Sequence, residues 1–136
     1  MNETVLWLIT LGVAGTMLGA GTLKLLFTPE HLAKNGPPII GRTVFTDLNW
    51  SLDVPPGLVK FIGAAEVLGG LGLVLPALTG VATVLVPIAA VGVAVTMVGA
   101  VGLHIHRREA WGVVFPAVLL IGAVLVAWSR FAPNPL

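Results

Sequence analysis

The sequence predicts an all-α integral membrane four-helix bundle, formed by residues 1–136 as a single transmembrane domain. Two observations support this. Hydrophobic residues make up 57% of the chain and charged residues only 10%, whereas soluble domains carry roughly 25% charged residues. Four apolar runs, at about 5–26, 58–75, 81–104 and 111–129, also come close to the roughly 20 residues that a spanning helix needs. The four spans use nearly the whole chain, so we expect no soluble domain.

The first run, about 5–26, is expected to be a retained span. A cleavable signal peptide would begin with a positively charged region, and none precedes this run. Gly15 and Gly19 form a GxxxG element within it, which permits the close approach of another helix. Lys24 closes the uncharged part of the span.

Residues 28–57 form the one long connection, which is too polar and too rich in Pro and Gly to span. A short helix is predicted from Pro29 to Asn35. Thr28 suits its N-cap, Pro29 suits the first helical position, and Gly36 is a stop signal. The rest of the connection has no clean period, so we expect it to lie on the membrane surface or to fold back as a lid.

The second span follows Pro55 and Pro56 and is predicted to end at Pro76. Lys60, in its first turns, is expected to extend its ammonium group to the lipid headgroups. A short uncharged linker then makes the second and third spans an antiparallel hairpin. Pro87 is expected to bend the third span. A compact polar turn, His104 to Glu109, leads into the fourth span.

The basic residues predict the orientation. Arg130 alone falls on the side of the termini, and the others fall on the side of the first and third connections: Lys24, Lys34, Arg42, Lys60, Arg107 and Arg108. By the positive-inside rule the long connection is cytoplasmic and both termini lie outside, in a multi-pass protein of the inner membrane. Trp7 and Trp128 would form an aromatic belt at one interface, and Trp50 and Trp111 at the other.

Composition also excludes several function classes. The formal net charge is +1 and the basic residues are scattered, so the footprint of a nucleic-acid binder is missing. Without cysteine, the chain itself forms no disulfide and no thiolate site. His104 and His106 stand two positions apart, and such side chains diverge on a helix, so we expect no metal site.

Glu66 is the acidic residue that stands inside an apolar run. A charge near the bilayer centre costs about 2.5–3.5 kcal/mol on insertion scales, so such a residue faces protein or water and marks a functional site. Gly63, Gly69 and Gly70 share its helical face. This glycine-lined stripe either admits a neighbouring helix or leaves room for a ligand.

Residues of the first and third spans are candidates to act beside Glu66 as ligand-binding or proton-relay groups. Lys24 either pairs with Glu66 or extends to lipid phosphates. Thr96 and Met97 lie at matching depth, where a protonated Glu66 would hydrogen-bond to Thr96 or donate to a backbone carbonyl. His104 either closes the cytoplasmic side of the space beside Glu66 or belongs to a basic turn that fixes the topology of the protein. No catalytic residue is assigned.

Several of these features recur together in one known family. They are Lys24 ending the first span, Trp50 and Pro55-Pro56 in the connection, the block Gly63-x-x-Glu66-x-x-Gly69-Gly70-x-Gly72, and Met97-x-x-Ala100-x-x-x-His104. With them, nearly the whole chain resembles the DoxX-like family of small bacterial membrane proteins. The resemblance implies a four-helix membrane bundle. Because the family name derives from a subunit of a thiosulfate:quinone oxidoreductase, it also implies an association with membrane redox complexes.

Three functional hypotheses result. In the leading one, the protein binds an apolar small molecule, with a quinone as the candidate cofactor, as part or anchor of a membrane redox system. Glu66 would supply the buried polar group there, and any enzymatic activity would be oxidoreductase-associated. The second is a structural subunit that assembles with itself or with a partner through GxxxG faces. The third is a small oligomeric transporter. The lipid bilayer is the expected environment in all three.

Overall fold

The computed structural model describes residues 1–36, 48–131 and 136. Four long helices, each long and apolar enough to cross a membrane, account for most of them: α1 (Glu3–Leu26), α3 (Pro56–Thr79), α4 (Leu85–His106) and α5 (Ala110–Phe131). A short helix, α2 (Pro29–Asn35), and one turn of 3-10 helix, η1 (Asn49–Leu52), lie between α1 and α3. The predicted all-α membrane bundle is therefore confirmed.

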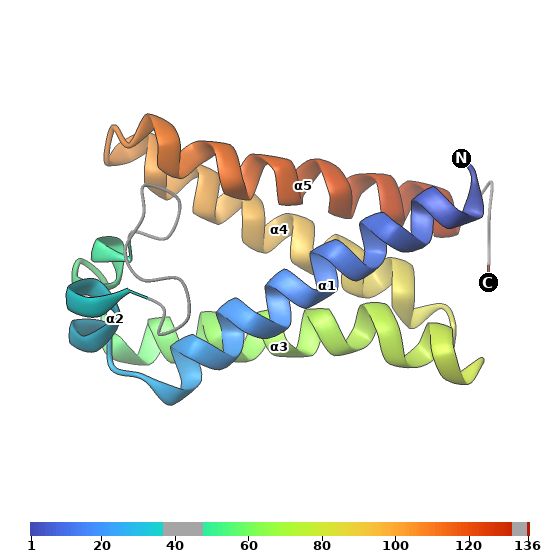
Figure 1. Ribbon diagram of the computed structural model, residues 1–136, viewed down its shortest axis with the longest axis horizontal. Coiled ribbons are helices and arrows are strands. Elements are labelled where there is room, and N and C mark those ends of the chain that lie inside the picture. Colours follow the sequence, from blue (N-terminus) through green and yellow to red (C-terminus); the bar gives the residue numbers. More distant parts are fainter. Residues whose placement is uncertain (37–47, 132–135) are drawn as a thin grey trace.

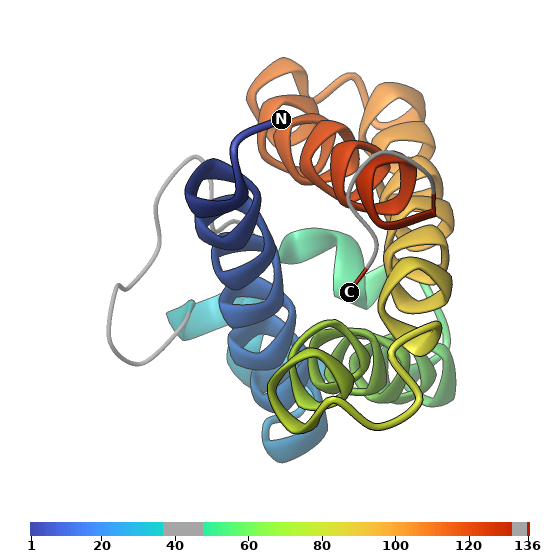
Figure 2. The same cartoon turned by 90° about the vertical axis from the view of Figure 1, so that its right-hand side faces the viewer.

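The helices pack as two pairs, α1 on α3 and α4 on α5, and α3 joins the pairs through its contacts with α4. Figure 1 shows both chain termini at the same end of the bundle, here named the terminus end. The other end, which carries α2, is named the loop end. Figure 2 looks from the terminus end along the bundle, and η1 lies behind its centre, at the loop end.

The core between the long helices is apolar. Because a bilayer offers no strong hydrophobic drive between helices, such packing rests on close contact and on small residues. The fully buried side chains of this core, each 1% exposed or less, are Leu6, Ala14, Met17, Leu73, Val86, Ala90, Ala123 and Val126.

Two of the long helices, α3 and α4, have an end that lies about four residues from the sequence expectation. α3 does not end at Pro76 but continues to Thr79, because backbone groups in an apolar setting are best satisfied within a helix. It stops at Gly80, whose φ of 68° gives the left-handed conformation of a C-terminal cap. α4 starts at Leu85, after this turn, and extends through His106, so the polar turn is shorter than expected.

α2 forms as predicted, from Pro29 to Asn35. The Thr28 hydroxyl accepts a hydrogen bond from the backbone N–H of His31 at 3.2 Å, which satisfies one of the unpaired donors at the helix start. Gly36 caps the other end with a φ of 68°. Trp50 and Pro55 belong to the described part of the connection, but most of the segment expected to fold back, residues 37–47, lies outside the described residues.

α1 and α3 approach closely through facing glycines. A Cβ atom added at Gly21 would lie 2.6 Å from the carbonyl oxygen of Gly63, and one at Gly63 would lie 2.9 Å from that of Gly21. Two turns along, a Cβ at Gly70 would lie 3.0 Å from the carbonyl oxygen of Ala14. These positions therefore set the distance between the two helix axes.

Other glycines singled out in the sequence have different surroundings. Gly69 faces α4, where a Cβ atom would lie 2.7 Å from Val93. A Cβ at Gly15 or Gly19 would meet nothing within 4 Å. Among the described residues, the helix contact expected of this GxxxG element is therefore not made, because α1 turns its other face, with Gly21, towards α3.

Candidate functional site

A buried ion pair joins α1 to α3. Nζ of Lys24 donates hydrogen bonds to Oε1 and Oε2 of Glu66, at 2.9 and 2.7 Å, and the two side chains are only 7% and 6% exposed. Of the alternatives for Lys24, the structure shows pairing and not extension to lipid. Each partner stands three residues after a contact glycine, Gly21 or Gly63, and i and i+3 share a helix face. The close helix contact therefore brings the two charges together.

The indole ring of Trp50 lies next to the lysine of this pair. Its centroid is 5.9 Å from Nζ of Lys24, which is within cation–π range. Trp50 is 8% exposed, whereas Trp111 and Trp128 are 62% and 71% exposed. Assigning Trp50 to an aromatic belt was therefore wrong, because η1 carries it into the protein. Lys24, Glu66 and Trp50 form what we call the ion-pair site.

Lys60 closes the end of α1 beside this site. Its Nζ donates to the carbonyl oxygens of Leu25 and Phe27, both at 2.8 Å. The last carbonyls of a helix have no partner within it and carry partial negative charge. The Lys60 ammonium group therefore binds carbonyl oxygens that have no partner within α1, and its extension to lipid headgroups stays a prediction.

His104 makes its polar contact at the α4–α5 turn. Its Nδ1 lies 2.7 Å from Oε2 of Glu109. Nε of Arg107 donates to Oε1 of the same carboxylate at 2.8 Å, and Arg107 also forms an ion pair with Asp53, the residue after η1. We call these four residues the turn cluster. The structure thus places His104 in the turn cluster and gives it a carboxylate partner other than Glu66.

The two remaining candidates on α4 have partners of their own. The Thr96 hydroxyl donates to the carbonyl oxygen of Gly92 at 3.0 Å, within the same helix. Met97 is 4% exposed and belongs to the apolar core. Glu66 is therefore bonded to Lys24, and the alternative of a protonated Glu66 held by Thr96 is not what the structure shows.

Sequence reasoning missed a second buried charge, at the terminus end. Arg130 is 5% exposed, and its Nη1 and Nη2 donate to the two carboxylate oxygens of Glu3 at 3.0 and 3.2 Å. Its guanidinium lies 5.6 Å from the centroid of the Trp7 ring. Glu3 and Trp7 stand four residues apart, which puts both side chains on one face of α1. This spacing of a carboxylate and an aromatic ring is the sequence signal for a site that holds a cation.

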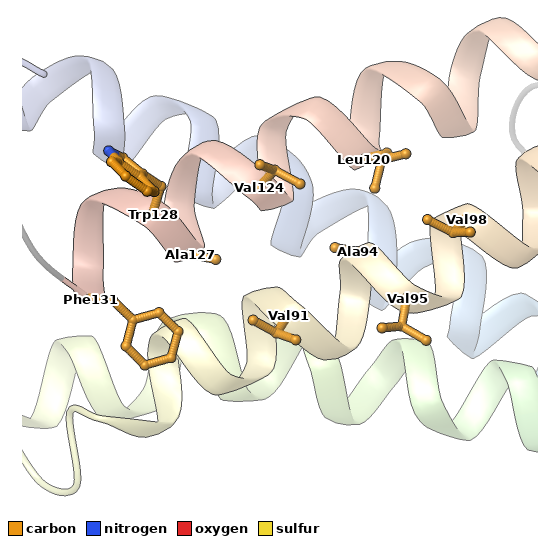
Figure 3. Close-up of a pocket in the computed structure, with 9 residues that line it drawn as sticks. All are labelled: Val91, Ala94, Val95, Val98, Leu120, Val124, Ala127, Trp128 and Phe131. Carbon is orange, nitrogen blue, oxygen red and sulfur yellow. The ribbon is translucent and has the colours of Figure 1, made fainter.

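Glu66 does not line either of two hollows that the described residues form. The larger, of about 520 Å³, is an apolar groove between α4 and α5 (Figure 3). It is lined by Val91, Ala94, Val95, Val98, Leu120, Val124, Ala127, Trp128 and Phe131. The smaller, of about 210 Å³, lies at the terminus end, beside Arg130. In the part of the chain that is described, no three His, Asp or Glu residues are placed to hold a metal ion.

Comparison with known proteins identifies the family. The family model described as the DoxX-like family matches residues 8–126. Because the match covers most of the chain, the chain belongs to the DoxX-like family, and the resemblance inferred from sequence is confirmed. No curated protein and no solved structure matches the chain. The matched segment includes both the ion-pair site and the turn cluster, and it ends before Arg130.

Proposed function

We propose that this DoxX-like membrane protein binds a quinone at the ion-pair site, as part or anchor of a redox system in the inner membrane. The observation that supports the proposal is the Lys24–Glu66 pair, buried within two membrane-spanning helices. A buried pair is often no more stable than apolar side chains of similar size. Ionisable groups inside a membrane span therefore favour a role in function over one in stability.

The three side chains of the site suit the head group of a quinone. The Lys24 ammonium is a donor for a quinone carbonyl oxygen, and the flat face of Trp50 is a surface on which an aromatic ring stacks. Glu66 is a group that takes up and releases protons, as reduction of a quinone to a quinol requires. The electrons would come from a redox partner in the same membrane.

Glu66→Gln tests the proposal. The amide keeps the size of the side chain but removes the charge that holds Lys24 in place. Hydrogen bonds to charged groups are worth about 1.5–3 kcal/mol, so we expect quinone affinity to fall by roughly tenfold or more. The measurement is a titration of the purified protein in detergent with a short-chain quinone, followed by quenching of tryptophan fluorescence.

The matched control is Glu30→Gln, which changes an exposed carboxylate on α2. It is expected to leave the titration unchanged. Unchanged quinone affinity in Glu66→Gln, together with unchanged partner-linked activity, would overturn the proposal.

Assembly through α1 is the second candidate function. Gly12, Gly15 and Gly19 follow one face of α1, and a Cβ atom at any of them would meet nothing within 4 Å. Leu8 and Leu11 beside them are 65% and 49% exposed. This face could receive a helix of a second copy or of a partner, since small residues let helix backbones approach.

Gly15→Leu separates the two functions. If α1 is an assembly face, the larger side chain holds the helices apart, and the protein should shift to a smaller species on native gels while quinone affinity is retained. The matched control is Gly99→Leu, at a glycine of α4 that also has nothing within 4 Å. An unshifted species would contradict the assembly role. A small oligomeric transporter stays a hypothesis, for which Glu66-dependent uptake into proteoliposomes is the test.

A further inference from the structure

We propose that Arg107 is a positioning residue for the ion-pair site. It acts through Asp53 and η1 to keep Trp50 in place against Lys24, so that the α4–α5 turn controls access to the ion pair from the loop end. The inference rests on the proposed function only in assuming that a quinone uses this access. The seating of Trp50 is a property of the protein without ligand.

The first step is the short connection from Asp53 to Trp50. Asp53 caps η1, and its backbone N–H donates to the carbonyl oxygen of Trp50 at 3.1 Å. Its carboxylate forms the ion pair with Arg107. One hydrogen bond therefore connects Asp53, which is held by Arg107, to the backbone of Trp50.

The second step is that Arg107 is itself held in place. It caps the C-terminus of α4, and Glu109 accepts its Nε–H at 2.8 Å. The other oxygen of Glu109 lies 2.7 Å from His104, on the last turn of α4. The guanidinium thus bridges two carboxylates, one on the α4–α5 turn and one beside η1, and its side chain is only 21% exposed.

The third step is that η1 is a single turn of 3-10 helix, Asn49–Leu52. A single 3-10 turn has poor internal hydrogen-bond geometry, so its position depends on tertiary contacts. One such contact is made by Ser51, whose hydroxyl lies 3.3 Å from the carbonyl oxygen of Pro29 on α2, besides its shorter hydrogen bond of 2.7 Å to the carbonyl oxygen of Leu48. The Asp53–Arg107 pair supplies another, from the opposite pair of helices. Without it, η1 is expected to lift away from Lys24 more often.

Thiol labelling measures this opening directly. The chain contains no cysteine, so Ser51→Cys introduces one thiol, at a position that is 1% exposed. A water-soluble maleimide then reports how often η1 opens. Because a partly exposed ion pair contributes little to stability, Arg107→Gln is expected to raise the labelling rate by up to about fivefold. Arg107→Lys retains the charge and should largely restore the slow rate.

Two comparisons separate positioning from general loosening. Arg108→Gln changes the neighbouring exposed arginine and should leave labelling slow. Asp53→Asn should act like Arg107→Gln, and the two changes together should raise the rate no further, since they remove one interaction. Equal labelling in Arg107→Gln and in its parent, or an equal rise in Arg108→Gln, overturns the proposal.

A second measurement avoids the introduced cysteine. Hydrogen exchange of the Ser51 and Asp53 backbone amides, in a chain that keeps Ser51, should accelerate in Arg107→Gln by the same factor. The same variants are titrated with the short-chain quinone. If labelling and exchange respond but the parent protein binds no quinone, the proposed function fails and the role of Arg107 stands. If the parent binds quinone but neither measurement responds, only the role of Arg107 fails.

Discussion

Lys24→Met is expected to lower the free energy of unfolding by about 3–5 kcal/mol, because it leaves the Glu66 carboxylate buried without its partner. The methionine side chain is nearly as long as lysine, so packing changes little and the lost charge dominates. The measurement is reversible unfolding of the protein in mixed micelles of mild detergent and SDS, followed by circular dichroism.

The control for Lys24→Met is Lys34→Met, at an exposed lysine of α2, where surface changes are usually within about 0.5 kcal/mol. Adding Glu66→Leu to Lys24→Met should recover most of the loss, because well-packed apolar residues replace a buried pair at little cost. A loss in the double variant as large as in the single one would show that the pair is not the source of the effect.

For the Lys24–Glu66 pair, the sequence predicts the depth of each residue in the membrane but not their contact. The spans and their polar ends follow from hydropathy, so Glu66 and Lys24 could both be assigned a depth. Whether they meet depends on how each helix is rotated about its axis. For this reason the sequence left pairing, extension of Lys24 to lipid and a protonated Glu66 open as alternatives, and the facing glycines Gly21 and Gly63 explain why the two side chains meet.

Gly21 was overlooked because the GxxxG element of Gly15 and Gly19 is the more familiar pattern. Such a motif indicates that a close contact is possible, but it does not say which helix face turns inward. A better signal was the matched spacing of small residues, Ala14 with Gly21 on α1 and Gly63 with Gly70 on α3. Each charged residue of the ion pair follows one of these positions by three residues.

Trp50 and Arg107 could not be assigned for a different reason. η1 lies in a segment without periodicity, and its place over Lys24 depends on Asp53, Ser51 and a turn more than fifty residues away. Local propensity carries no information on such contacts. For His104 the sequence left two interpretations open, a residue that closes the space beside Glu66 or part of a basic turn that fixes topology, and the carboxylate partners of the turn were not expected.

Gly63→Ala is the second change with a large expected effect. Its Cβ would lie 2.9 Å from both the carbonyl oxygen of Gly21 and Cβ of Lys24. Backbone and Cβ atoms cannot rotate away, so α1 must shift, and overpacking of this kind costs about 1–3 kcal/mol. Because the shift moves Lys24 relative to Glu66, quinone affinity should fall together with stability. Both are measured as above, by unfolding in mixed micelles and by fluorescence titration.

Gly15→Ala is the matched control, since it makes the same chemical change on α1 where nothing lies within 4 Å. Alanine is favoured over glycine inside a helix by about 1 kcal/mol, so this variant should be as stable as the parent or more stable. Gly63→Ala should lower the free energy of unfolding and Gly15→Ala should leave it unchanged or raise it. This difference separates the effect of the helix contact from that of helix propensity. If Gly63→Ala proved as stable as Gly15→Ala, the α1–α3 contact would have to be looser than the facing glycines require, and the ion pair would lose its structural support.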